Sequence, residues 1–309
     1  MTHRNSGLST SWQSGLIRDG GELLDVLGAS GLSGLEIDYR VSGEALRQME
    51  PRLRSGEFTV LSLHNYCPTP PGYEGHPNVA ALFNPASLDT EERKLAVKYS
   101  IRTIQTAADL GARLVVFHLG VIDMDFRMKE LFQLHEEEGE DSPLFQERIQ
   151  ELQRERAEKA GAHLTPLLRT VEAVHTEAHK RSILMGVENR YRLSQIPVGD
   201  EFDLLFNEFE GGELRYWHDV GHAEVFARLG LLDHERDLLR RFQKRLAGMH
   251  IHDIAGFKDH LAPGMGTFDF SLLPPYLGEE SLRIIEAHDP VDLAQLREGV
   301  RLLQEKGVL

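Results

Sequence analysis

The sequence predicts an α/β protein folded as a single (β/α)8 TIM barrel, and three observations support this. Eight short apolar segments alternate with longer amphipathic segments, which is the pattern of parallel βαβ units. A chain of 309 residues has the length of one such barrel. The first apolar segment continues as Gly7-Leu8-Ser9-Thr10-Ser11, without the glycine-rich phosphate loop that usually follows the first strand of an open doubly wound sheet. We therefore expect one domain over residues 1–309.

The apolar segments predict strands and the amphipathic segments predict helices. The expected strands are 8–12, 34–38, 58–64, 113–118, 183–188, 214–219, 248–252 and 282–286. The expected helices are 20–27, 43–54, 90–111, 166–181, 201–206, 223–228, 233–246 and 291–306. The third helix is marked most clearly, because acidic residues follow Asp89 at its start and Gly111 stands at its end.

Two connections are longer than a barrel needs. Residues 65–88 are rich in Pro, Gly and Asn and predict an ordered loop over the barrel mouth. Residues 121–164 are charged and helical in pattern, with an acidic run at 136–141, and predict a helical excursion. A solvated excursion, a lid and an oligomer contact all remain open for this second segment.

The composition excludes several classes of protein. The formal charge of −15 argues against a surface that coats nucleic acid or binds an anionic membrane. The only cysteine is Cys67, so no intrachain disulfide forms. No apolar run reaches the length of about 18 residues that a membrane span requires, and residues 1–20 carry no signal-peptide core. We expect a cytoplasmic protein with a small-molecule substrate and no nucleic-acid or membrane partner, in which homo-oligomerisation stays open.

Residues that commonly bind metals stand at the ends of the predicted strands. Side chains two apart share one face of a strand, and on this parity each series of inward residues ends in such a residue. The set is His64, His118, Glu188, Asp219, His222, His250, His252, His260 and Glu286. In a barrel these ends converge on one mouth, where active sites lie. Imidazoles and carboxylates crowded there would repel each other or lose solvation without a cation, so the sequence predicts a divalent metal site.

Three motifs carry a family resemblance: Asp219-x-x-His222, His250-x-x-Asp253, and the turn from Asp259 to Gly266. With them the chain resembles the xylose-isomerase-like TIM-barrel superfamily, which contains sugar isomerases and epimerases and the endonuclease IV type of nuclease. The resemblance to the epimerases implies one divalent ion, such as Mn²⁺, held by Glu188, Asp219, His250 and Glu286. It also implies that His222 touches the substrate and that Glu188 and Glu286 move protons.

The nuclease branch of the superfamily implies further metals. There, positions matching His64 and His118 join Glu188 on a second zinc, and His222 with His260 helps to hold a third. The third site takes a carboxylate two residues before His260, where this chain has Lys258. We expect the Lys258 ammonium to repel a third metal and to contact substrate instead.

Two other side chains are candidates for contacts to substrate. Arg190 follows Glu188 on a loop after a strand, so it can bind a phosphate or carboxylate at the mouth, although a surface salt bridge explains it equally well. Trp217 can form an apolar wall for a sugar ring or pack in the core.

The favoured function is isomerisation or epimerisation of a small sugar or sugar-phosphate-like substrate through an enediolate. The expected cofactor is Mn²⁺ or Zn²⁺, with Mg²⁺ and Co²⁺ also open. Glu188 and Glu286 are the expected catalytic pair. The alternative is a zinc-dependent hydrolase of the endonuclease IV type, acting on a phosphodiester or an amide. A third alternative is a binding protein that kept the site without turnover.

Overall fold

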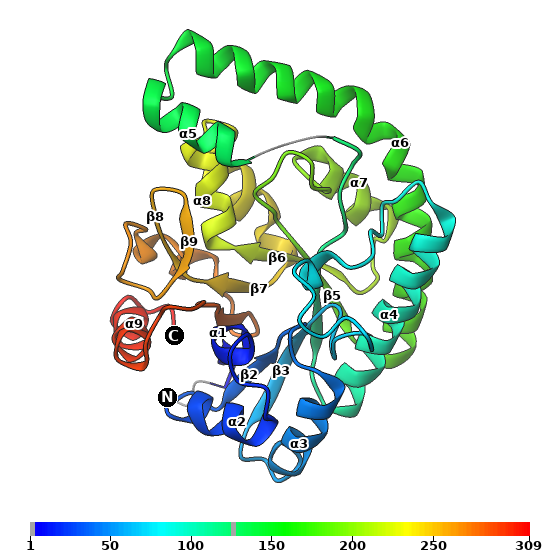
Figure 1. Cartoon of the computed structure of the whole chain (residues 1–309), viewed down its shortest axis with the longest axis vertical. Coiled ribbons are helices and arrows are strands. Elements are labelled where there is room, and N and C mark those ends of the chain that lie inside the picture. Colours follow the sequence, from blue (N-terminus) through cyan, green and yellow to red (C-terminus); the bar gives the residue numbers. More distant parts are fainter. Residues whose placement is uncertain (1–3, 125–127) are drawn as a thin grey trace.

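The protein closes eight parallel strands into a barrel, as a computed structural model that describes residues 4–124 and 128–309 shows (Figure 1). The strand order around the barrel is β1-β10-β7-β6-β5-β4-β3-β2. The strands are β1 Ser6–Ser9, β2 Gly34–Ile37, β3 Thr59–His64, β4 Leu114–Phe117, β5 Leu184–Glu188, β6 Leu214–Asp219, β7 Leu246–Ile251 and β10 Leu282–Ile285. The predicted TIM barrel is confirmed. We call the end at which these strands finish the mouth, and the end at which they begin the floor.

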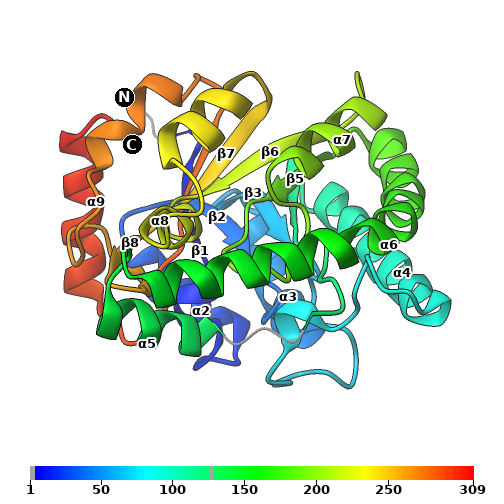
Figure 2. The same cartoon turned by 90° about the horizontal axis from the view of Figure 1, so that it is seen from above.

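Helices surround the barrel on its outside (Figures 1 and 2). The α-helices are α1 Ser11–Ser14, α2 Gly20–Gly28, α3 Gly43–Arg54, α4 Thr90–Asp109, α5 Met128–Glu138, α6 Pro143–Arg181, α7 Asp200–Glu208, α8 Val220–Arg228 and α9 Leu293–Glu305. Short helical turns are η1 Val79–Ala81, η2 His234–Arg240, η3 Gln243–Arg245, η4 Phe270–Leu272 and η5 Pro274–Tyr276. No helix in the described part of the chain is long and apolar enough to cross a membrane.

Trp217 fills the interior of the barrel. Its side chain is fully buried in a cluster with Leu61, Leu114, Val116, Leu282 and Ile284. Gly248 leaves room for it, because a Cβ atom there would lie 2.5 Å from Trp217 Cζ3 and 2.8 Å from Leu282 Cβ. The ring centroid of Trp217 lies 5.0 Å from that of His250. The packed interior therefore supports the mouth from below.

Helix α6 begins at Pro143, far before the predicted start at 166. Ser142 caps it by accepting a hydrogen bond from the Phe145 amide, and Ser182 ends it in the left-handed conformation. Pro166 lies inside this helix instead of at its start. The prediction was wrong because a proline removes only one hydrogen bond, and packing on both sides of it, through His163 and Leu167, outweighs that loss.

Other boundaries also differ from the prediction. The segment 233–246 forms the π-helical η2 and the 3₁₀ turn η3 instead of one α-helix. The first strand ends at Ser9, and Trp12 lies in α1. A hairpin of β8 Asp253–Ala255 and β9 Lys258–Leu261 replaces what the sequence indicated only as a turn.

The predicted excursion at 121–164 contains α5 and the first half of α6, while its residues 125–127 lie outside the described part of the chain. Figure 2 shows these two helices running side by side along one flank of the molecule, and they pack against each other. His163 of α6 ties two loops of the mouth together. Its Nδ1 donates to the Ala86 carbonyl at 2.7 Å, and its Nε2 accepts from the Asp123 amide at 3.1 Å.

Candidate metal centre

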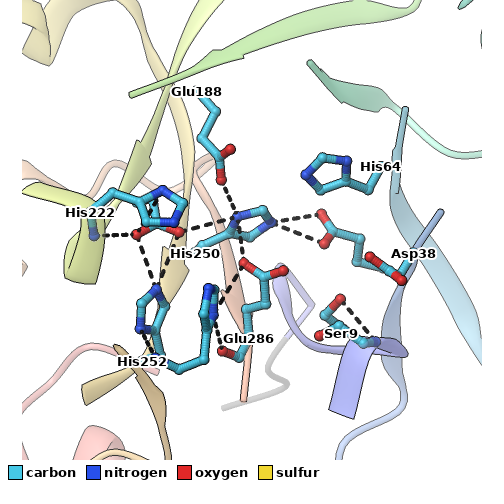
Figure 3. Close-up of polar contacts among 12 residues, drawn as sticks. Ser9, Asp38, His64, Glu188, His222, His250, His252 and Glu286 are labelled. Atoms are coloured by element: carbon cyan, nitrogen blue, oxygen red, sulfur yellow. Dashed lines mark hydrogen bonds and ion pairs between the residues drawn. The ribbon is translucent and has the colours of Figure 1, made fainter. Parts of the chain in front are cut away.

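His250 lies at the centre of the barrel mouth, and carboxylates from three other strands converge on it (Figure 3). Its Nδ1 lies 2.8 Å from Glu188 Oε1, 3.0 Å from Glu286 Oε2 and 3.7 Å from Asp219 Oδ2. One ligand atom from each of the four residues lies within 4.8 Å of the others, and all four residues are buried. The structure thus brings together the four residues that the family resemblance implied as metal ligands.

Glu36 holds the opposite nitrogen of His250 and was not singled out from the sequence. His250 Nε2 donates to Glu36 Oε1 at 2.9 Å, and Ser62 Oγ donates to Glu36 Oε2 at 2.8 Å. Such a carboxylate behind a ligating imidazole fixes the ring orientation and raises its basicity. The only sequence signal for Glu36 is that a charged residue stands inside an otherwise apolar strand, Gly34–Ile37. The structure buries its side chain fully.

The electrostatics of this group favour a cation. Burial opposes charge on His250, yet Glu286 and Glu36 raise the pKa of its imidazole well above the ordinary value. Burial would raise the pKa values of Glu188, Asp219 and Glu286. The charge of Arg190 on Glu188, and the neighbouring imidazoles on Asp219 and Glu286, nevertheless hold all three pKa values well below their usual range. The proton on Nδ1 therefore neutralises carboxylates that a divalent ion would bind. The mixed carboxylate and imidazole donors suit Zn²⁺ or Mn²⁺.

Asp219 is fixed by the start of α8. Its Oδ1 accepts from the His222 amide at 2.7 Å and from His252 Nε2 at 3.0 Å. His222 Nδ1 donates to the Asn189 carbonyl at 3.1 Å. His222 lines the cavity, and its Nε2 has no hydrogen-bond partner among residues 4–124 and 128–309.

His64 and His118 form a second possible ligand group with Glu188. His118 Nε2 lies 2.7 Å from Glu188 Oε2 but outside hydrogen-bond geometry. Burial, together with the charge of Arg190, lowers the pKa of His118 to about 3, so its imidazole is neutral and able to bind a metal. The ring centroids of the two histidines are 4.5 Å apart.

Arg190 binds Glu188 Oε2, the oxygen that also lies near His118. Its Nη1 donates to Glu188 Oε2 and lies 3.4 Å from His222 Nδ1. Its predicted place at the mouth agrees with the structure, where it is partly buried instead of forming a surface salt bridge. A guanidinium keeps its charge, so it opposes a second dication beside Glu188.

Lys258 does not lie where the sequence predicted it, beside His260 at the cavity. Lys258 is exposed and does not line the cavity, whereas Asp259 does. His260 has a φ of 54°, and this left-handed residue breaks the strand alternation that would have put Lys258 and His260 on one face. Asp259 Oδ2 consequently lies 3.9 Å from His222 Nε2 and 3.8 Å from His260 Nε2, and these three residues form a third possible ligand group.

The structure places Trp217 in the core, which is one of its two expected roles, and not at the substrate wall. Its place in the barrel interior leaves no exposed surface, because parity directs it inward one layer below His250. The mouth cavity has a volume of about 430 Å³. The predicted residues that line it are His64, His118, Glu188, Arg190, His222, His260 and Glu286. Arg40 and Tyr39 line it as well and were not anticipated, while Pro77 and Asn84 come from the predicted mouth loop.

A buried hydrogen-bond chain supports the backbone of Asp219. Asn189 Oδ1 accepts from the Asp219 amide at 2.8 Å, and Asn189 Nδ2 donates to the Asp219 carbonyl at 2.9 Å, which fixes the orientation of the Asn189 amide. Tyr216 must therefore donate its hydroxyl proton to Asn189 Oδ1, 3.0 Å away. The same hydroxyl accepts from His218 Nδ1 at 2.9 Å.

This row of hydrogen bonds continues from His218 to His234 and Glu224, and the N–H groups at His218 Nδ1 and His234 Nε2 donate toward Tyr216. Burial keeps the pKa of His218 well below its usual value, so its Nε2 has no proton and accepts from His234 Nε2 at 2.9 Å. His234 Nδ1 lies 2.7 Å from Glu224 Oε1. Burial would raise the pKa of Glu224, but His234 lowers it, so Glu224 is ionised and accepts.

Comparisons with known proteins agree with this fold. A profile of the xylose isomerase-like TIM barrel matches residues 24–305. The chain is 25% identical over 212 residues to the uncharacterized protein y4fM of Sinorhizobium fredii, a match that covers 67% of this chain and 57% of that protein.

Two solved structures of sugar epimerases are similar in fold. The apo 3-keto-D-glucoside 4-epimerase YcjR from E. coli has a TM-score of 0.67 and 15% identity, over 97% of this chain and 99% of that one. The D-psicose 3-epimerase from Clostridium cellulolyticum H10, solved with D-tagatose, has a TM-score of 0.66 and 12% identity, over 97% and 98% of the two chains.

Proposed function

Since the chain belongs to the xylose isomerase-like TIM-barrel family, we propose that it is a divalent-metal-dependent isomerase or epimerase of a small sugar or sugar-phosphate-like substrate. The observation that carries this proposal is the environment of His250. Three carboxylates converge on its Nδ1 while Glu36 holds its Nε2. The sugar epimerases of similar fold support the same class of substrate.

The four residues around His250 suit one divalent ion. When bound, such an ion would polarise a carbonyl oxygen of the substrate and stabilise the enediolate charge. Glu188, Asp219, His250 and Glu286 would hold it.

Glu188 and Glu286 are the proposed proton-transfer pair. One takes the proton from the carbon beside the carbonyl, and the other returns a proton to the opposite face or to the neighbouring carbon. Glu286 lines the cavity, and its Oε1 lies 3.8 Å from His288 Nε2. Glu188 Oε2 is held by Arg190, which can also bind a hydroxyl or an anionic group of the substrate.

Arg190 favours a single metal. At about 4 Å and an effective dielectric constant of about 20, two unit charges interact by roughly 4 kcal/mol, and a dication beside Glu188 Oε2 would meet about twice this repulsion from Arg190. The site then suits carbonyl chemistry better than a hydrolysis that needs several metals.

The proposal is tested by isotope exchange. The protein is loaded with Mn²⁺ and incubated in D₂O with D-tagatose, D-psicose and D-fructose, and with ketose phosphates. We expect deuterium at the carbon next to the carbonyl before net conversion is measurable, and none with metal-free protein. No exchange and no conversion with any of these sugars would contradict the proposal.

A zinc-dependent hydrolase is the second candidate, and a specific observation favours it. Three further possible ligand groups flank the centre in the described part of the chain, namely His64 with His118 and Glu188, His222 with Asp259 and His260, and His252 with His260 and Glu286. Zinc content after reconstitution, together with cleavage of bis(4-nitrophenyl) phosphate, separates the two. Two or three bound Zn²⁺ with phosphodiester cleavage would replace the isomerase, whereas one bound ion without cleavage would retain it.

A further inference from the structure

A second, larger cavity of about 950 Å³ opens at the floor of the barrel. Its lining includes the first residues of four strands, Leu114, Leu184, Leu246 and Leu282, and loop residues that precede them. The metal ligands lie where the strands finish, so the two cavities are at opposite ends of the barrel. Sites for small organic molecules typically have volumes of about 300–1,000 Å³.

The deepest part of this cavity is apolar. Leu114 and Leu282 belong to the interior cluster around Trp217, and Leu184 and Ala247 pack against that cluster while remaining only partly buried. Tyr276 and Leu277 border the same space from η5 and the residue after it. Partly exposed aliphatic side chains around a concave surface lower their free energy when an apolar group covers them.

The rim of the cavity is basic, in contrast to the whole chain. The chain has 34 basic and 49 acidic residues. The lining residues of the floor cavity reverse this balance, with five basic residues, Arg113, Arg181, Arg215, Lys244 and Arg245, and two acidic residues, Glu279 and Glu280. An excess of cations in a concave surface favours an anionic ligand.

Three of these cations have no carboxylate partner within residues 4–124 and 128–309, whereas the other two are paired. Arg113 pairs with Glu280 at 2.9 Å, and Arg181 with Glu177 at 2.6 Å. The Nη1 of Arg215 donates only to the carbonyls of Gly212 and Leu214. Arg245 lies over the ring of Phe206, with its Cζ 5.2 Å from the centroid, and Lys244 is exposed. Arg215, Lys244 and Arg245 are therefore available to an anion.

We propose that the floor cavity is a binding site for an anionic amphiphile, a small molecule with an aliphatic or aromatic body and one phosphate or carboxylate group. The body covers Leu184 and Ala247, and the anionic group contacts Arg215, Lys244 and Arg245. Guanidinium groups bind either anion through paired hydrogen bonds. This site does not depend on the function proposed for the mouth.

The first test measures binding of 8-anilinonaphthalene-1-sulfonate, a fluorescent aromatic anion. We expect saturable binding at one site per chain. The double variant Lys244→Ala/Arg245→Ala should bind it about tenfold more weakly or worse, because hydrogen bonds to charged groups are lost. The matched control Arg47→Ala/Arg54→Ala, which removes two exposed cations of α3, should bind like wild type. Absence of saturable binding, or equal affinity in the two double variants, would overturn the proposal.

The second test displaces the probe with ligands of one chain length. Decyl phosphate or decanoate should displace it while 1-decanol should not, and the stronger of the two acids identifies the preferred anionic group. Displacement by 1-decanol equal to that by the acids would contradict the role of the cations. Displacement by inorganic phosphate as strong as by decyl phosphate would contradict the role of the apolar floor.

Discussion

The mouth and the floor of this barrel bring charged side chains together in opposite ways. At the mouth, four carboxylates surround one imidazole, and Glu36, Glu188, Asp219 and Glu286 are all nearly or fully buried. At the floor, basic side chains form an open rim where water can solvate them. Buried charges need a compensating partner, whereas solvated ones are stable without one. The same substitution of a carboxylate should therefore have a much larger effect at the mouth of the barrel than at its floor.

The largest effect is expected from Glu286→Gln at the mouth. The change keeps the size of the side chain and one ligating oxygen but removes the basic carboxylate. Turnover should fall by about 10²-fold or more, far more than metal content falls. Solvent deuterium exchange and elemental analysis on the same samples measure the two quantities. Loss of metal in proportion to activity would mean that Glu286 acts as a ligand only.

A smaller effect is expected from Glu36→Gln, one layer behind the ligands. The neutral amide polarises His250 less, so metal affinity should fall by about 10–100-fold. Calorimetric titration with Mn²⁺ measures this, and Ser62→Ala, which removes only the hydroxyl that donates to Glu36, should change affinity less. Unchanged affinity in Glu36→Gln would show that the mouth does not depend on this carboxylate.

The Ile284→Val variant, in the barrel interior between the mouth and the floor, tests whether loss of packing affects stability without affecting activity. Ile284 is fully buried in the barrel interior and pairs in register with His250 on the neighbouring strand. The free energy of unfolding should fall by about 0.5–1.5 kcal/mol, as measured by urea denaturation, with the exchange rate unchanged. A lower deuterium exchange rate would contradict this expectation, because activity at the mouth would then depend on the packing below it.

The smallest effect is expected from Glu280→Gln at the floor, which repeats the chemical change made at Glu286. Its ion pair with Arg113 is solvated, with 44% and 85% of the Arg113 and Glu280 side chains exposed. Such pairs contribute about 0–1 kcal/mol, so the unfolding midpoint should hardly change and activity should stay that of wild type. Activity lost here as at Glu286 would show that both carboxylates act only through general stability.

The sequence predicted the barrel from the alternation of apolar and amphipathic segments, and strand parity predicted which residues face the mouth. Strand parity placed Glu188, Asp219 and Glu286 on the inner face, and the structure brings them together with His250. Alternation fails where the backbone leaves the extended region. Because His260 is left-handed, Asp259 lines the mouth cavity and Lys258 is exposed, the reverse of what alternation predicts. No sequence signal marks a histidine for that conformation.

Long-range partners were also beyond sequence reasoning. Glu36 stands 214 positions from His250, and nothing local to the strand shows that a carboxylate faces an imidazole there. The sequence left Trp217 between the substrate wall and the core, because an aromatic residue near a site suits either. The structure places it in the barrel interior, where Gly248 leaves room for its ring.

The chain of hydrogen bonds from His234 to Asn189 has one further consequence. Each N–H or O–H group in it points toward Asn189, so the bond dipoles of His234, His218 and Tyr216 add head to tail. Their positive ends are directed at the mouth. The aligned dipoles of these bonds therefore raise the electrostatic potential around Asp219. Carboxylates that crowd one another at the mouth are partly balanced by polar groups that do not line the mouth cavity.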